Sequence, residues 1–273
     1  MFNHIIFDIR FLQIFVMASL LSLGVYIYDF SLSSGQVALT FTAGLLTQVY
    51  WINKYKLTNK SLLSAGITCL GLVLLLRSNN LWLHPLIAMA AISSKFLIQK
   101  NKQHIFNPTA IGLVFALTLF SSGWLSPGQW GSQFILAFWF VAIGSLLTFR
   151  ARQLDMAWYF LLFYIGGMAI RNLYLGYEIE ILIHAVKNGS LLLFTFFMIT
   201  DPKTTPNHRN SKILFAFVIA ASSLVCRYYF YLNHSYIYCL VIANLFVPFF
   251  NKKFIAPKFQ WRVYEKKSVS YSC

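Results

Sequence analysis

Long apolar segments alternate with short polar ones along almost the whole chain. A helix needs about 20 apolar residues to cross the roughly 30 Å of hydrocarbon in a bilayer. The pattern therefore predicts an all-α polytopic membrane protein with about ten transmembrane helices in one integral-membrane domain. The predicted spans lie at 11–28, 36–52, 60–76, 81–98, 108–124, 132–149, 156–175, 181–200, 212–230 and 234–250.

The basic residues give an independent test of this helix count. Loops on the cytoplasmic side of a membrane protein carry an excess of Lys and Arg. With the amino terminus inside and ten spans, every Lys and Arg falls on the cytoplasmic side except Arg77, Arg171, Lys187 and Arg227. A wrong count would scramble this alternation, so we expect both termini to be cytoplasmic.

Ten spans divide into five and five. An odd number of spans per half makes the two halves enter the membrane in opposite directions, as in inverted-repeat folds. We expect residues 1–130 to form the first inverted half and residues 131–250 the second. Residues 251–273 form a basic cytoplasmic tail, which suits the anionic surface of a bilayer.

Composition narrows the function classes. The chain is 58% hydrophobic and 11% charged, whereas a soluble domain averages about 25% charged residues. The 22 Lys and Arg residues, which give the chain a net charge of +15, lie in short clusters between apolar runs. The expected partner is therefore the lipid bilayer and not nucleic acid. Histidine, cysteine and carboxylate residues show no metal-ligand spacing and no catalytic cluster.

The first polar motif is HIFNPTAIGLV, residues 104–114. Asn is a favoured N-cap, and Pro fits the first helical turn because its missing N–H would be unpaired there. One interpretation is a well-capped helix start. The other is a binding site, because a helix N-terminus offers partial positive charge and free N–H groups. The candidate ligand-binding residues of this motif are Asn107, Pro108, Thr109 and Gly112.

The second motif is FFMITDPKTTP, residues 196–206. Pro202 prevents the helix from continuing, so the motif can be a simple helix stop. However, Asp201 is one of only seven acidic residues, and a polar break at 187–190 interrupts the eighth span, as in discontinuous helices that line a site. The candidate residues here are Thr200, Asp201, Pro202 and Thr204. Both motifs fall on the same predicted membrane face, which indicates a shared pocket.

Both motifs resemble segments of a known protein family. FNPTAIGLV, residues 106–114, is similar to the F-N-P-x-x-x-G signature of the D subunit of Rnf-type electron-transport complexes and the B subunit of the sodium-translocating NADH:quinone reductase. The second motif and ANLFVP, residues 243–248, resemble the T-D-P-x-T element and the last helices of that family. The resemblance implies ten helices in two inverted five-helix halves, bound flavin, and other membrane redox subunits as partners. It also implies a multi-pass protein of the bacterial inner membrane that helps to couple electron transfer to ion movement.

One family feature is missing from this chain. Members typically hold FMN through a phosphoester to a threonine of an S/G-A-T type sequence between spans five and six. Between Leu119 and Phe134 no Ala-Thr pair follows a Ser or a Gly, and the chain resembles a short branch of the family. We therefore expect no covalent FMN and propose non-covalent FMN, riboflavin or a quinone near Asn107 and Asp201.

Three functions remain open at this point. The favoured one is a subunit of a redox-driven ion-translocating system that has no catalytic side chains of its own, because the cofactor supplies the chemistry. The alternatives are an inverted-repeat transporter or channel for small solutes or ions, and a scaffold that holds partner subunits.

Overall fold

The computed structural model describes residues 8–27, 30, 32–100, 103–126 and 134–254. For residues 134–139 it describes the backbone only. The predicted basic tail beyond residue 254 and the loop around the predicted boundary at 130 lie outside the described residues. The described part is helical apart from two short antiparallel ribbons, which confirms the predicted helical class.

The elements follow one another in two groups. The first group holds α1 (Ile9–Tyr26), α2 (Ser34–Tyr55), α3 (Ser61–Leu75), β1 (Leu76–Ser78), α4 (Leu83–Leu97), β2 (Gln99–Lys100), β3 (Gln103–His104), α5 (Pro108–Leu119) and β4 (Gly123–Leu125). The second group holds α6 (Phe134–Arg150), α7 (Leu154–Leu175), α8 (Ile179–Val186), α9 (Gly189–Leu193), the π-helix η2 (Phe194–Met198), α10 (Arg209–Tyr228), α11 (Ser235–Asn244) and α12 (Val247–Lys253).

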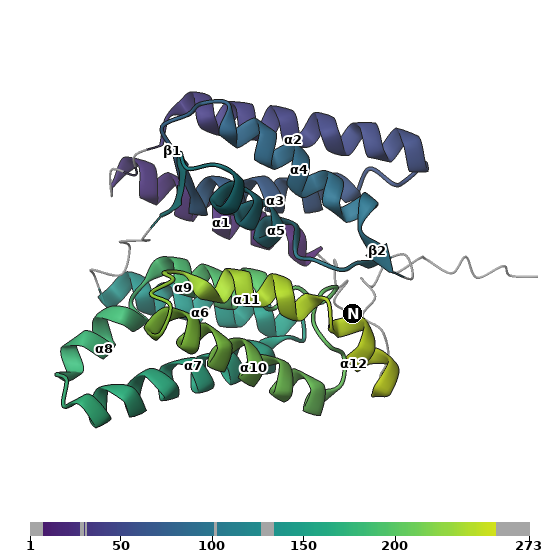
Figure 1. Ribbon diagram of the computed structural model, residues 1–273. Coiled ribbons are helices and arrows are strands. Elements are labelled where there is room, and N and C mark those ends of the chain that lie inside the picture. The colour runs from purple at the N-terminus through teal and green to yellow at the C-terminus, as the bar shows by residue number, and fades with distance from the viewer. Residues whose placement is uncertain (1–7, 28–29, 31, 101–102, 127–133, 255–273) are drawn as a thin grey trace, which may run out of the picture.

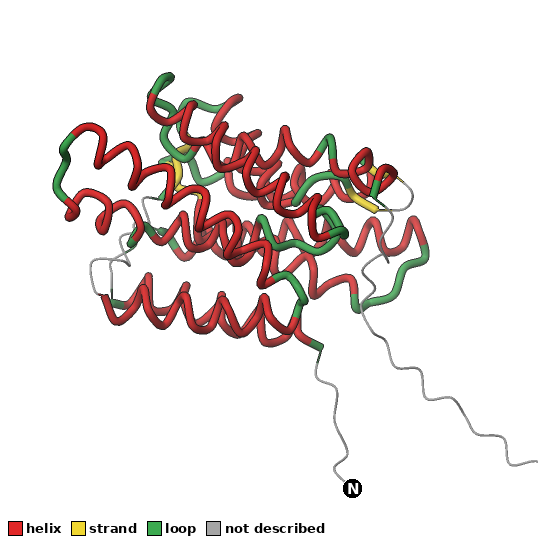
Figure 2. Tube along the Cα trace, turned by 90° about the horizontal axis from the view of Figure 1, so that it is seen from below, coloured by secondary structure: helices red, strands yellow, loops and turns green. Residues whose placement is uncertain are grey.

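These two groups form two packed layers (Figure 1). Helices α1 to α5 make one layer and α6 to α12 the other, with the helices of each layer lying side by side (Figures 1 and 2). The packing order is similar in both layers: α2 contacts α4, α4 contacts α5 and α1 contacts α3, while α7 contacts α10, α10 contacts α11 and α6 contacts η2. Contacts of α1 with α6 and of α5 with α11 join the layers. The inverted relation of the two halves stays a prediction.

The number of membrane crossings also stays a prediction. Within the described residues, α1 and α10 are long and apolar enough to span a membrane by themselves, and the count rises to four if each bent helix pair is one span. Other apolar helices are shorter, among them α3, α4 and α5. Each of the ten predicted segments nevertheless overlaps a helix or a bent helix pair, and the structure supports a multi-pass membrane protein.

One predicted span ends earlier than the apolar run suggests. The run from 108 to 124 was expected to be one helix, but α5 stops at Leu119, and Gly123–Leu125 forms a strand that pairs with Leu76–Ser78. The Ser126 N–H also donates to the Leu75 carbonyl at 2.7 Å. This ribbon satisfies backbone groups that a shortened helix leaves unpaired, which buried peptide groups require.

The break predicted in the eighth span is confirmed. Helix α8 ends at Val186, and the next helical segment, Gly189–Met198, is inclined to it by 52°. Asn188 starts that segment, because its side-chain oxygen accepts from the N–H groups of Ser190 and Leu191. The segment continues from α9 into the π-helix η2. Short π-helical turns are rare and are often found at functional sites. The second polar motif, residues 196–206, begins in the last turn of this segment and lies at the interface between the layers.

Candidate functional site

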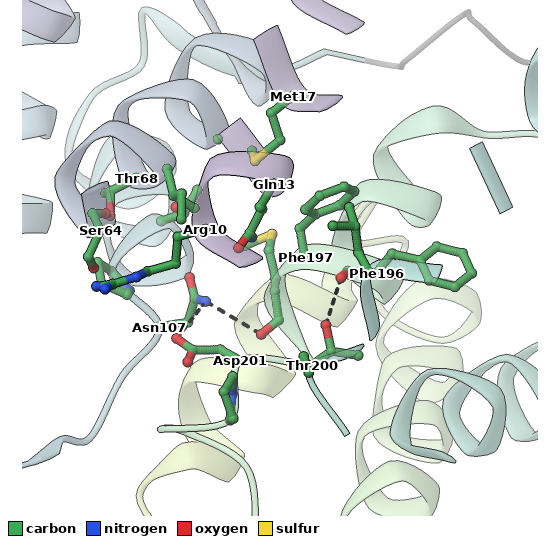
Figure 3. A pocket seen from close by; sticks show the side chains of 18 of the residues that line it. Arg10, Gln13, Met17, Ser64, Thr68, Asn107, Phe196, Phe197, Thr200 and Asp201 are labelled. Carbon is green, nitrogen blue, oxygen red and sulfur yellow. Dashed lines mark hydrogen bonds between the residues drawn. The ribbon is translucent and has the colours of Figure 1, made fainter. Parts of the chain in front are cut away.

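Asn107 connects the two layers through one side chain. Its Oδ1 accepts a hydrogen bond from the Ala110 N–H at 3.1 Å and so caps α5, as the sequence predicts. Its Nδ2 donates to the Met198 carbonyl at 3.4 Å and to Asp201 Oδ2 at 3.3 Å. Figure 3 shows Asn107 and Asp201 side by side. The helix cap of the first motif is therefore also a contact with the second motif, 94 residues further along the chain.

Asp201 is held by the turn that follows η2. Its Oδ1 accepts from the Lys203 N–H at 3.1 Å. Its main-chain carbonyl accepts from the N–H groups of Thr204 and Thr205 and from Thr205 Oγ1 at 2.7 Å. Pro202 ends the helix at this point because it lacks an N–H and clashes with a preceding carbonyl. The turn fixes the carboxylate at the layer interface.

His104 is the third group at this position. It ends β3, whose pairing with β2 brings its ring beside the carboxylate, and Nε2 lies 3.7 Å from Asp201 Oδ2. Burial lowers the pKa of His104 below its usual value, although Asp201 opposes this shift. For Asp201, burial alone would raise the pKa, but the interactions with His104 and the Lys203 N–H outweigh it and lower the pKa. At neutral pH the pair is thus a carboxylate beside a neutral imidazole.

This pair predicts that the protein loses stability in mild acid. Because the pKa of His104 is lower in the folded protein than its ordinary 6.5, the unfolded chain binds protons more readily, and folding stability falls as pH decreases from 6.5. Asp201 acts in the same direction only below pH 3.8. Thermal unfolding in detergent between pH 7.5 and 5 should therefore show a steeper loss for the wild type than for His104→Gln. Parallel curves for the two proteins would contradict the assignment.

The three groups border a cavity of about 110 Å³ between the layers. Its walls come from α1, α3, the start of α5, the end of α6 and the α9–η2 segment with the turn after it. Figure 3 shows side chains of these elements converging on it. The polar lining residues are Arg10, Gln13, Ser64, Thr68, His104, Asn107, Thr109, Thr148, Thr200, Asp201 and Lys203, and the apolar ones include Met17, Leu75, Leu147, Phe196 and Phe197.

Most residues singled out from the sequence meet here. Asn107, Pro108, Thr109, Thr200, Asp201 and Pro202 all line the cavity. Thr204 does not, because it is buried inside the turn, where its Oγ1 lies 3.4 Å from the Asp201 carbonyl. Gly112 does not either, since a Cβ at this position would lie 2.8 Å from the Ala91 Cβ. The structure thus gives Gly112 a packing position between α4 and α5.

Several cavity residues were missed because they lie inside apolar runs. Arg10, Gln13 and Met17 come from α1, and Ser64 and Thr68 come from α3. The only signal for them is helical spacing: residues three or four apart share one helix face. The pairs Arg10 and Gln13, and Ser64 and Thr68, fit this spacing, but a sequence does not say which helix face meets a cavity.

The arrangement suits a ligand with a polar edge and an apolar body. Asn107 supplies an amide donor, Asp201 supplies carboxylate acceptors, and Leu75, Leu147 and Phe197 supply apolar walls. A few convergent polar groups in an otherwise apolar pocket are typical of small-molecule sites. Among the described residues, no group of three or more His, Cys, Asp or Glu is placed to hold a metal ion.

The second half of the chain matches a known protein family. Residues 125–260 match the model of the NQR2, RnfD, RnfE family, and this match contains Asp201 and the whole segment from α6 to α12. The chain resembles that family. A comparison with curated proteins gives no match.

Proposed function

We propose that this chain, which resembles the NQR2, RnfD, RnfE family over residues 125–260, is an integral-membrane subunit of a redox-driven, ion-translocating electron-transport complex. The observation that carries the proposal is the hydrogen bond from Asn107 to Asp201. It joins the two motifs on which the resemblance rests, and it does so at a cavity between the layers. Other membrane redox subunits are the partners that this function requires.

We further propose that the cavity binds a flavin, either FMN or riboflavin, or a quinone, without a covalent bond. Both hydrogens of Asn107 Nδ2 are used within the protein, by the Met198 carbonyl and Asp201 Oδ2. A ligand that opens the bond to Asp201 gains Nδ2 as a donor for a ring carbonyl, and Asp201 then becomes an acceptor for the ring N–H of a flavin. Phe196, Phe197 and Met17 provide apolar surface for the ring. Such a ring supplies one- or two-electron transfer when bound, while the protein binds and orients it.

The size of the cavity sets a condition on this proposal. Ligand pockets usually have volumes of about 300–1,000 Å³, whereas this cavity has about 110 Å³. The chemistry of the lining fits a ring with an imide edge, but a three-ring flavin requires the walls to move apart. We expect this movement between α1 and η2, which face each other across the cavity through Gln13, Met17 and Phe197.

The complex function is tested in membrane vesicles from cells with and without the chain. We expect electron transfer from the native donor, and the accompanying charge movement reported by a voltage-sensitive dye, to disappear without the chain. Wild-type protein should restore both signals, and Asp201→Asn, produced at equal amounts, should not. If vesicles without the chain keep both signals, the redox function is wrong.

A transporter is the second candidate, because the bend between α8 and the α9–η2 segment is typical of discontinuous transporter helices. Purified protein in liposomes separates the two functions. A solute flux that runs without any electron donor would favour a transporter. Absence of flux together with loss of partner subunits from the membrane on deletion would favour a scaffold.

We also propose that both termini face the cytoplasm of a bacterial cell, because the basic residues follow the positive-inside rule in that orientation. A reporter fused after Lys253 tests this. Green fluorescent protein should fluoresce and alkaline phosphatase should be inactive, and the reverse result would overturn the orientation.

A further inference from the structure

Lys95 is a buried lysine that none of the roles above uses. It lies in the last turn of α4, and the side chain is 6% exposed. Its Nζ donates to the Ser64 carbonyl at 3.2 Å and lies 3.4 Å from Ser64 Oγ. Within the described part of the chain, no carboxylate forms an ion pair with it. A buried lysine without a carboxylate in contact is costly when it is charged, so its position needs a reason.

The position places Lys95 directly behind the wall of the cavity. Ser64 and Thr68 both line that wall from α3. The Ser64 carbonyl accepts from Lys95 Nζ and also from Thr68 Oγ1 at 2.9 Å. One residue therefore separates the ammonium group from the cavity, and the field of the charge reaches the space between the layers with little water to screen it.

Basic side chains outnumber acidic ones around the cavity. Arg10 is paired with Asp8 by a salt bridge. Among the described lining residues, Asp201 is the only acidic one, and Lys203 lines the same cavity. Asp201 and Lys203 both act electrostatically on Lys95, with opposite sign. The surroundings of the cavity thus hold two lysines, Lys95 and Lys203, and the positive end of α5, against the one carboxylate of Asp201.

Lys212 is a second buried lysine in this protein, and it has a carboxylate partner. It is also 6% exposed, at the start of α10. However, its Nζ contacts both carboxylate oxygens of Asp155, at 3.0 and 3.1 Å. Among the described residues, no carboxylate takes the corresponding place at Lys95.

We propose that Lys95 is a positioning residue that makes the cavity selective for a ring ligand that carries, or gains on reduction, one negative charge. It acts through Ser64 without touching the ligand. The inference deepens the proposed function and rests on it for the redox ligand, but charge selectivity itself can be measured with a ligand that is not redox-active.

Orotate and uracil are suitable probes because they share one imide ring and differ in a carboxylate. Thermal unfolding of the full chain in detergent is followed with each probe for the wild type, Lys95→Met, Lys95→Arg and Lys212→Met. We expect the wild type to bind orotate on the order of tenfold more tightly than uracil. Lys95→Met should lose this preference, and Lys95→Arg and Lys212→Met should keep it.

The unliganded proteins give a second readout. Without a probe, Lys95→Met should unfold at the same temperature as the wild type or higher, because an uncompensated buried charge is removed. Lys212→Met should unfold at a lower temperature, since Asp155 loses its partner. If Lys95→Met is less stable and Lys95→Arg restores stability while the orotate preference is unchanged throughout, Lys95 is a structural anchor and the inference is overturned. The same holds if the wild type does not distinguish the two probes.

A flavin measurement separates this inference from the proposed function. Where the wild type binds flavin, Lys95→Met should weaken the reduced form on the order of tenfold relative to the oxidised form, and an equal change in both forms overturns the inference. A wild type that prefers orotate but binds no flavin refutes the flavin proposal and leaves the charge selectivity of Lys95 supported.

Discussion

Asn107→Ala is expected to lower the free energy of unfolding by about 2–4 kcal/mol and to abolish ligand binding. Loss of the N-cap of α5 accounts for about 1 kcal/mol. Loss of the Nδ2 hydrogen bonds leaves the Met198 carbonyl and Asp201 Oδ2 short of a donor in a buried place, which costs about 1–3 kcal/mol. Denaturant or thermal unfolding in detergent measures the first effect, and binding of flavin to the purified protein measures the second.

Two variants separate the cap from the link between the layers. Asn107→Ser keeps a capping oxygen but is too short to donate to Asp201, so it should retain α5 and lose the ligand. Asn107→Asp also keeps the cap but places a second carboxylate beside Asp201, and it should be less stable than Asn107→Ser. If Asn107→Ala and Asp201→Ala both left ligand binding and complex activity intact, the shared site would be refuted.

Gly112→Leu is expected to destabilise the protein by about 3 kcal/mol or more, because overpacking of a close helix contact typically costs 1–3 kcal/mol and sometimes more. A Cβ at Gly112 would lie 2.8 Å from the Ala91 Cβ and 3.3 Å from Ile87 Cγ2 and Leu72 Cδ2. Close approach through small residues is a common device for packing membrane helices. The larger side chain must separate α4 from α5 and disturb the start of α5.

Gly166 is the matched control for this substitution. It lies in α7, and a Cβ there would meet nothing within 4 Å. Gly166→Leu should therefore be neutral or slightly stabilising, since leucine favours the helix more than glycine does. If Gly112→Leu is as stable as Gly166→Leu, the packing assignment is wrong. Loss of ligand at full stability would instead support the ligand-binding role that the motif suggests.

Local chemistry explains which parts of the site were predictable. An Asn-Pro pair at the start of an apolar run signals a cap, and an Asp-Pro pair at the end of one signals a stop, because both effects act within one helical turn. The sequence therefore predicted Asn107 and Asp201. Their hydrogen bond at 3.3 Å depends on how the two layers pack together, and rules for residues within one helical turn do not predict it.

Tertiary structure explains what was missed. Gly112 shares a motif with Asn107, but one turn of helix moves it from the cavity to the α4–α5 contact. Arg10 and Ser64 reach the cavity because α1 and α3 turn these positions toward the second layer. The early end of α5 at Leu119 depends on a ribbon with Leu76–Ser78, a partner more than 40 residues away that hydrophobicity does not reveal.

We propose that the Asn107–Asp201 cavity holds a redox ring in a membrane redox subunit. The most direct test is the visible absorption and flavin fluorescence of the purified wild type, recorded before and after acid precipitation. We expect flavin in equimolar amount, released into the supernatant by acid and absent from Asn107→Ala and Asp201→Ala. Colourless wild-type protein that also yields no quinone to organic solvent, or flavin that stays with the precipitated chain, would refute the non-covalent redox ring.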